Sequence, residues 1–218
     1  MYIQRLHHFN YYSICIGEIG VGKSSLINTI LKYGKKEPIF NIKNSRNNIT
    51  KKIDSYYIDY GINKFYFIDT PGLNSKDDKN KILRLKEYIS ILKNNYYSKR
   101  INCILLFMKI TDYRFTNSML EIIKELLNLF PSYNFWEHVI IIRTHTILNE
   151  QIDIIKGNFI SSIQNNDIIK KIMNEKGIKQ PNFIKEFYVD SVKQGNINTN
   201  INTKIEHILN EIKNISSF

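Results

Sequence analysis

Cysteines and long hydrophobic runs are both scarce in this 218-residue sequence. The two cysteines, Cys15 and Cys103, each lie inside an apolar run, so we interpret them as buried thiols of a reducing compartment. The longest apolar run, at 103–108, is far shorter than the roughly 20 residues of a membrane-spanning helix, and the first residues lack the apolar segment of a signal peptide. We therefore expect a soluble cytoplasmic protein, with the cytosolic face of a membrane as the alternative location.

Acidic side chains are outnumbered, because 20 Asp and Glu stand against 31 Lys and Arg and give a net charge of +11. Such an excess suits an anionic partner, for instance a nucleotide, a nucleic acid or an acidic membrane surface. Lysine, asparagine and isoleucine are abundant along the whole chain, however, which favours a general compositional bias. Because no arginine-rich or aromatic-interleaved stripe is present, we expect no nucleic-acid partner, and peripheral membrane association stays open.

Apolar stretches bounded by turn residues alternate with segments of helical periodicity, which predicts an α/β fold. Two expected strands, 53–60 and 64–69, are separated by Gly-Ile-Asn, so we expect an antiparallel hairpin there. Thr116 is placed to cap a helix that Pro131 ends. The other expected strands are 12–16, 102–108, 138–144 and 184–190, and the other expected helices are 23–33, 81–94, 150–173 and 201–215.

The segment GEIGVGKSS, at 17–25, lies between an expected strand and an expected helix. It fits the phosphate-binding loop, in which glycines let backbone N–H groups and a helix N-terminus face phosphate oxygens. Lys23 would reach the outer phosphates, and the hydroxyl of Ser24 would bind Mg²⁺. The alternative interpretation is a glycine-rich turn. The predicted nucleotide-binding residues of this segment are Gly17, Glu18, Ile19, Gly20, Val21, Gly22, Lys23, Ser24 and Ser25.

A second motif, Asp-Thr-Pro-Gly at 69–72, comes at the end of an expected strand. Asp69 can hold the magnesium through water, and the backbone N–H of Gly72 can sense a terminal phosphate. ATPases of this loop class more often carry an acidic pair at that strand end. The threonine that follows Asp69 therefore favours a GTPase.

Thr50 is the only threonine between Thr29 and Thr70, in the polar stretch that ought to supply a magnesium ligand dependent on the terminal phosphate. We predict that Thr50 binds the metal and takes part in hydrolysis. Its loop would then order with the triphosphate and loosen with the diphosphate. The alternative is a solvated threonine in a surface loop.

These motifs, together with DYRFTNS at 112–118, NFWEHVIIIRTHT at 134–146 and FYVDS at 187–191, resemble the G domain of the immunity-associated (GIMAP or IAN, AIG-type) GTPases and their protist relatives. The chloroplast import-receptor GTPases are more distantly similar. The resemblance spans about 12–213, so 1–218 would be a single AIG-type G domain. It implies a Ras-like P-loop G domain, an α/β fold whose mixed, mostly parallel six-stranded sheet has helices on both faces.

The resemblance also implies GTP or GDP and Mg²⁺ as ligands, slow GTP hydrolysis and a homodimer formed through the nucleotide face. Leu73 stands where many GTPases carry the glutamine that orients the attacking water, so we expect slow intrinsic hydrolysis. Arg114 matches a family arginine that can reach a partner's nucleotide, and a finger of this kind accelerates hydrolysis by roughly 10³ to 10⁵. The alternative is that Arg114 pairs with Asp112 or with solvent.

The expected base site departs from the usual guanine-binding motif. Most GTPases read guanine with a carboxylate, but Ile147 stands in that position here, and Glu150 is an alternative source of the acid. His145 resembles the import-receptor version, in which a histidine packs against the base. Guanine preference is therefore implied by the resemblance rather than by the motif. The predicted base-binding residues are Thr144, His145, Asp190 and Ser191.

Together these observations predict a GTP-binding protein with slow Mg²⁺-dependent GTP hydrolysis, regulated by nucleotide-dependent dimerisation. A non-hydrolysing scaffold that assembles with GTP is one alternative, which Leu73 and the altered base motif favour. A P-loop ATPase or small-molecule kinase is the other alternative, and it would bind ATP as tightly as GTP.

Overall fold

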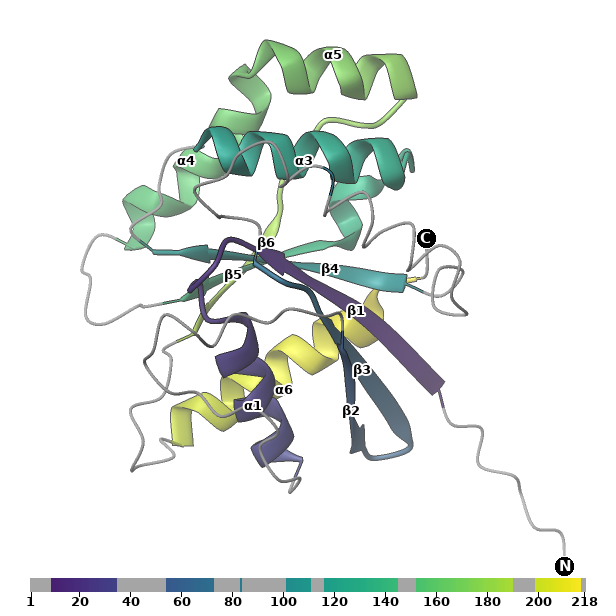
Figure 1. The fold of residues 1–218 in the computed structure, drawn as a ribbon, viewed down its shortest axis with the longest axis vertical. Coiled ribbons are helices and arrows are strands. Elements are labelled where there is room, and N and C mark those ends of the chain that lie inside the picture. Colours follow the sequence, from purple (N-terminus) through teal and green to yellow (C-terminus); the bar gives the residue numbers. More distant parts are fainter. Residues whose placement is uncertain are drawn as a thin grey trace, which may run out of the picture.

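A sheet of six strands, in the order β2-β3-β1-β4-β5-β6, forms the centre of the fold (Figure 1). The computed structural model describes residues 9–34, 54–72, 83, 101–110, 116–144, 152–189 and 199–216. Neighbouring strands are parallel except for β2 and β3, which are antiparallel. The strands are β1 (Phe9–Gly17), β2 (Asp54–Tyr60), β3 (Asn63–Asp69), β4 (Ile101–Lys109), β5 (Val139–Thr144) and β6 (Lys185–Val189).

The hairpin expected from the sequence is present between β2 and β3. Tyr60 pairs with Asn63 across a turn that contains Gly61, whose φ of 61° is in the left-handed region that glycine adopts most easily. This hairpin places β2 at the edge of the sheet, and β3 is the parallel neighbour of β1. The end of β3 therefore lies next to the end of β1.

Helices cover both faces of the sheet, as Figure 1 shows. On one face lie α1 (Lys23–Tyr33) and α6 (Thr199–Asn214). On the other face lie α3 (Asn117–Leu129), α4 (Ile152–Asn165) and α5 (Asp167–Lys176), together with the short 3-10 helix η2 (Phe135–His138) before β5. A separate apolar cluster fills each interface, and both clusters draw on the central strands. The mixed, mostly parallel sheet with helices on both faces confirms the predicted fold class.

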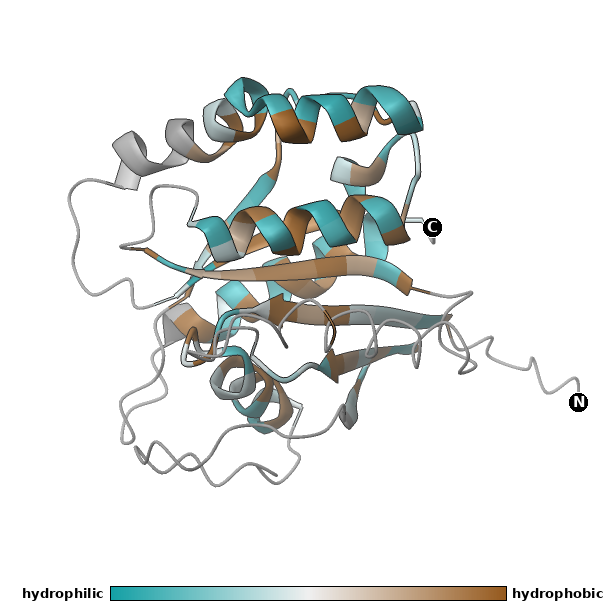
Figure 2. Cartoon of the chain, turned by 45° about the horizontal axis from the view of Figure 1, so that its top comes forward, coloured by the Kyte–Doolittle hydropathy of each residue, from teal (hydrophilic) through white to brown (hydrophobic). Residues whose placement is uncertain are grey.

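The central strands β4 and β5 are buried along nearly their whole length, as parallel strands covered on both faces must be. Figure 2 shows the hydrophobic residues of the sheet and of the inner helix faces turned toward one another. Cys15 and Cys103 lie in this interior as free thiols with no exposed surface. Burial raises the pKa of both thiols, which keeps them protonated.

The helix boundaries agree with the sequence in several places. Helix α1 has the predicted bounds, and Thr116 caps α3 by accepting a hydrogen bond from the backbone N of Met119 at 3.1 Å. The single helical stretch expected at 150–173 is wrong, because α4 ends at Asn165 and the Oδ1 of Asn166 accepts from Ile169 N and starts α5. The helix expected at 81–94 lies outside the described residues apart from Leu83.

Candidate functional site

The loop between β1 and α1 turns sharply at its glycines. Gly20 and Gly22 have φ values of 74° and 89°, which side chains with a Cβ rarely adopt. Gly17 has no space for a side chain, since a Cβ there would lie 2.6 Å from the backbone O of Phe107 on β4. The loop therefore follows a path that only these glycines permit, and α1 begins at Lys23 directly behind it.

Lys23 folds back across the loop that precedes it. Its Nζ donates to the backbone O of Gly17 at 3.1 Å and to the backbone O of Glu18 at 3.0 Å. Only 6% of Lys23 is exposed. Burial lowers the pKa of Lys23, and the nearby carboxylate of Asp69 acts in the opposite direction. A buried ammonium beside a loop of backbone N–H groups and a helix N-terminus makes a site for a phosphate anion.

Ser24 and Asp69 meet where α1 begins and β3 ends. The Ser24 hydroxyl donates to Oδ2 of Asp69 at 2.8 Å, and Asp69 has no exposed surface. The parallel pairing of β1 with β3 brings Asp69 opposite Cys15, two residues before the loop starts. A hydroxyl beside a carboxylate is a set of oxygen ligands that fits Mg²⁺. The residues present are thus suited to the predicted metal.

The segment after Asp69 packs directly on the phosphate-binding loop. The hydroxyl of Thr70 donates to the backbone O of Cys15 at 2.6 Å. A Cβ on Gly72 would lie 2.6 Å from the Cα of Ile19 and 2.7 Å from its N, so no larger residue fits there. The motif at 69–72 and the loop at 17–25, separate in the sequence, therefore form one surface.

Thr144 contributes from a third strand end. Its hydroxyl donates to the backbone O of Val21 at 2.7 Å, with the O of Met108 at 3.3 Å, and the side chain is buried. The methyl group of Thr144 also faces Gly22. Thr144 therefore holds the phosphate-binding loop against β5. Its predicted contact with a base stays a prediction.

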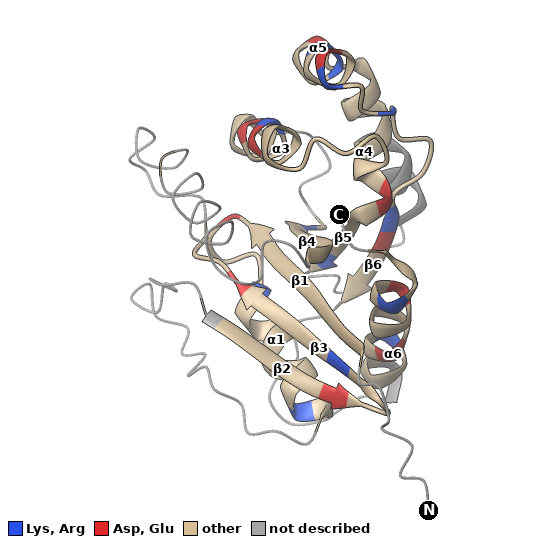
Figure 3. Cartoon of the chain, turned by 90° about the vertical axis from the view of Figure 1, so that its right-hand side faces the viewer, with Lys and Arg blue, Asp and Glu red and all other residues tan. Residues whose placement is uncertain are grey.

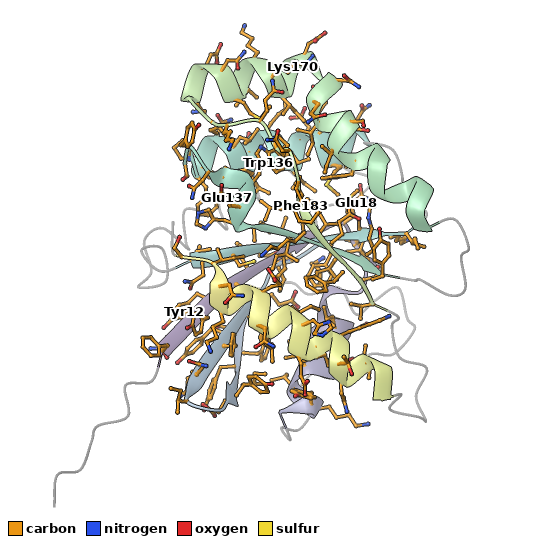
Figure 4. All side chains as sticks on the ribbon, turned by 180° about the vertical axis from the view of Figure 1, so that it is seen from behind. Tyr12, Glu18, Trp136, Glu137, Lys170 and Phe183 are labelled. Atoms are coloured by element: carbon orange, nitrogen blue, oxygen red, sulfur yellow. The ribbon has the colours of Figure 1, made fainter. Side chains whose placement is uncertain are left out.

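The side chain of Glu18 connects the loop to α3. Its Oε1 accepts from the hydroxyl of Thr116 at 3.1 Å, and Glu18 is labelled in Figure 4. Both residues belong to motifs that are visible in the sequence, but their contact depends on the fold and is not predictable from those motifs. A capping threonine directly before a helix was the one available signal.

The described predicted residues gather at the carboxyl ends of β1, β3 and β5, where ligands bind in open α/β sheets. Other predicted residues lie outside the described part of the chain. These residues are Thr50, Arg114, His145, Asp190 and Ser191, as well as Leu73, Ile147 and Glu150. Their predicted roles are not tested by the structure.

The described residues offer neither a cluster of metal-binding side chains nor a membrane-spanning helix. Within the ranges that the structure covers, no group of three or more His, Cys, Asp and Glu side chains is arranged to hold a metal ion. Among the helices described, none has the length and apolar character needed to span a membrane. The oxygen pair of Ser24 and Asp69 is thus the candidate metal position that the described residues offer.

Several solved structures share this fold at low sequence identity. Toc33 from Arabidopsis thaliana in complex with Mg²⁺ and GMPPNP has a TM-score of 0.62 and 16% identity, over 95% of this chain and 86% of that one. A structure of the chloroplast translocon components atToc33 and psToc159, described by the importance of dimerisation for GTPase activity, has a TM-score of 0.66 and 15% identity, over 94% and 82%. No curated protein matches the chain significantly.

The family assignment comes from the sequence. The AIG1 family model matches residues 13–215, which is nearly the whole chain and includes every strand end of the site. The shared fold of the Toc33 structures agrees with this match. The chain therefore belongs to the AIG1 family and is a P-loop GTPase.

Proposed function

We propose that this chain binds GTP and GDP with Mg²⁺, hydrolyses GTP slowly and is regulated by dimerisation. The observation that carries the proposal is the loop at 17–25, with buried Lys23 inside it and the Ser24 and Asp69 oxygens 2.8 Å apart beside it. Membership of the AIG1 family and the nucleotides bound to the Toc33 structures support the same ligands.

The metal would be held by Ser24 directly and by Asp69 through water, with predicted Thr50 as a further ligand. Mg²⁺ bound there neutralises the charge of the outer phosphate oxygens. The side chains of this chain do the rest of the binding. Lys23 supplies a positive charge that burial shields from water, and the N-terminus of α1 adds its partial positive charge.

The sequence supports slow hydrolysis, and the relatives support dimerisation. Leu73 cannot orient a water molecule as a glutamine does, and Arg114 of a second copy would compensate by stabilising the charge that develops on the transferred phosphate. The similar solved structures include a dimerisation-deficient mutant of Toc33 and a structure of chloroplast translocon components described by the importance of dimerisation for GTPase activity. We therefore propose a homodimer through the nucleotide face. A cytoplasmic location and peripheral membrane contact remain further proposals.

The first experiment is a titration of fluorescent GTP with Mg²⁺, competed by GTP, GDP and ATP. We expect displacement by the guanine nucleotides and weak displacement by ATP. Asp69→Asn is expected to weaken Mg²⁺-dependent binding about 10- to 100-fold. Asp59→Asn is the matched control, because Asp59 is an exposed aspartate on β2 that pairs with Lys64. Equal competition by ATP would favour the ATPase alternative, and no binding would contradict the proposal.

The second experiment measures phosphate release per molecule as protein concentration rises. A rate that increases with concentration in the wild type and stays flat in Arg114→Ala supports a finger supplied by the partner. Nucleotide affinity is measured on both proteins so that a binding defect is recognised. Assembly driven by GTP without phosphate release at any concentration would instead support the scaffold alternative.

A further inference from the structure

A completely buried guanidinium lies near the carboxyl end of β5. Arg143 has no exposed surface, and its Nε lies 3.5 Å from Oε2 of Glu186 on β6. The side chain of Glu186 is only 8% exposed, and β6 carries charges of both signs (Figure 3). Because buried charges are stable only when they are paired, the two side chains form a structural ion pair between the last two strands.

Two aromatic side chains contact this pair. The hydroxyl of Tyr188 donates to Oε2 of Glu186 at 2.9 Å. The guanidinium carbon of Arg143 lies 5.6 Å from the centre of the Phe159 ring on α4, within the range of a cation–π contact. In the parallel register Arg143 is opposite Tyr188 and Glu186 is opposite Ile141, so the ion pair runs diagonally across the two strands.

A buried ion pair contributes little net stability. Its desolvation cost offsets its attraction, so apolar replacement of both partners is often neutral or stabilising, whereas removal of one partner is strongly destabilising. A buried ion pair between two strands can instead favour one pairing register of those strands, because every other register separates the charges. A shift of β6 against β5 would move Glu186 away from Arg143 and leave both charges buried without each other.

Thr144, the residue after Arg143, connects this register to the proposed nucleotide site. Successive residues of a strand point to opposite faces, and Thr144 holds Val21 of the phosphate-binding loop at 2.7 Å. The end of β5 is thus held by the ion pair on one face and by the loop on the other. Strand β6 ends at Val189, opposite Thr144. Of the predicted base-binding residues, Thr144 ends β5, and His145, Asp190 and Ser191 follow the two strands in the sequence.

The geometry points to Arg143 and Glu186 as positioning residues that set how strongly this protein discriminates between nucleobases. The inference rests on the proposed function, since it requires a bound purine nucleotide. The ion pair sets the separation of the two strand ends from which the predicted base-binding residues start. The phosphates would be bound by the loop and by Lys23, which the loop's own backbone carbonyls hold, so they depend on this strand end less directly, through the contact of Thr144 with Val21. Loss of the pair therefore weakens base selection more than diphosphate binding.

The test uses nucleotides that share a diphosphate and differ in the base. GDP, IDP and ADP compete with fluorescent GDP on the wild type, on Arg143→Met/Glu186→Leu and on Glu186→Gln. The double variant removes both charges at similar volume, and the single variant keeps the shape of the acid. The matched control is Lys185→Met/Glu211→Leu, because that ion pair also starts on β6 but reaches α6. Thermal unfolding is measured for every variant.

We expect the ratio of the ADP to the GDP dissociation constant to fall about tenfold in the double variant, equal to about 1.4 kcal/mol, with the control unchanged. Glu186→Gln changes the ratio in the same direction, and it is compared only where thermal unfolding shows that it is folded, because it leaves the buried Arg143 without its charged partner. The inference is overturned if the folded Arg143 and Glu186 variants keep the wild-type ratio of the ADP to the GDP dissociation constant. It is also overturned if this ratio falls equally in the Lys185→Met/Glu211→Leu control. A wild-type protein that binds no guanine nucleotide overturns the proposed function itself.

Discussion

Lys23 carries its charge where water hardly reaches it. Its ammonium is held by two backbone carbonyls of the loop, and burial lowers its pKa below the usual 10.5. Partial negative charges of carbonyls and the carboxylate of Asp69 replace only part of the lost hydration. The free protein therefore contains a poorly solvated cation that an anionic ligand would stabilise.

Lys23→Met is expected to leave the nucleotide-free protein at least as stable as the wild type, although it abolishes nucleotide binding. The pKa of Lys23 is lower in the folded than in the unfolded state, so the charged lysine reduces the free energy of unfolding at pH values below that lowered pKa. The reduction disappears as the pH rises toward 10.5. The stability gained by the variant is thus largest near neutral pH and shrinks at alkaline pH.

Urea unfolding of both proteins without nucleotide, at neutral pH and near the alkaline limit, measures this difference. Lys32→Met on the same helix is the control, because Lys32 is exposed and its removal changes no desolvated charge. A Lys23→Met protein that is clearly less stable than the wild type at neutral pH would show that the contacts of the ammonium outweigh its burial.

At the scale of elements, α3 is joined to the phosphate-binding loop through its first capping residue. The hydroxyl of Thr116 accepts from Met119 N and donates to Glu18, so one oxygen both starts the helix and contacts the loop. The carboxylate of Glu18 also lies beside the positive end of α3, which favours the contact. A change in the loop can therefore be passed to α3.

Thr116→Ala is expected to lower stability by about 1 kcal/mol and also to change the rate at which bound GDP exchanges. Asn166→Ala is the control, because Asn166 caps α5 in the same way and the structure describes no contact between Asn166 and the loop. We expect it to lower stability by a similar amount and to leave exchange unchanged. Stopped-flow release of fluorescent GDP and thermal unfolding test the pair of variants. Equal exchange rates in both would argue against a functional connection.

Elements with a strong local signal were predicted from the sequence. The glycine-rich loop, the helix that begins at Lys23, the hairpin turn at Gly61 and the cap at Thr116 each depend on a few adjacent residues. The break between α4 and α5 was missed because both helices continue the same apolar periodicity. The side chain of Asn166 interrupts it by bonding to the backbone three residues later.

The candidate site was predicted only where a motif describes its chemistry. Lys23, Ser24 and Asp69 occupy the positions that the motifs imply, and the fold brings them together. The role of Thr144 as an anchor of the loop and the buried pair of Arg143 and Glu186 were not predicted. Both depend on which residues of neighbouring strands face each other, and that register is set by tertiary packing.

At the scale of the whole molecule, the described residues are built around two apolar clusters on opposite faces of one sheet. The proposed nucleotide site is at the carboxyl ends of β1, β3 and β5, which contribute to both clusters. A ligand bound there contacts the segments that start or end these strands. Its binding is therefore coupled to the unfolding of the whole domain.

GDP with Mg²⁺ at 100 times its dissociation constant is expected to stabilise the protein by about 2.7 kcal/mol. For a chain of this length that corresponds to a rise in Tm of about 5 to 10 °C. Differential scanning fluorimetry measures the shift, with ATP at the same concentration and Lys23→Met as controls. A shift of equal size with ATP would contradict guanine preference, and a shift in Lys23→Met would contradict binding at this loop.

Because both cysteines are buried, the surface of the protein has no thiol that reacts with thiol reagents. Cys15 and Cys103 are the only cysteines of the chain, both are fully buried, and burial favours their unreactive protonated form. A single cysteine introduced at exposed Gln180 would thus be the one site that maleimide dyes label in the native protein. Energy transfer between donor- and acceptor-labelled copies would then report their association directly.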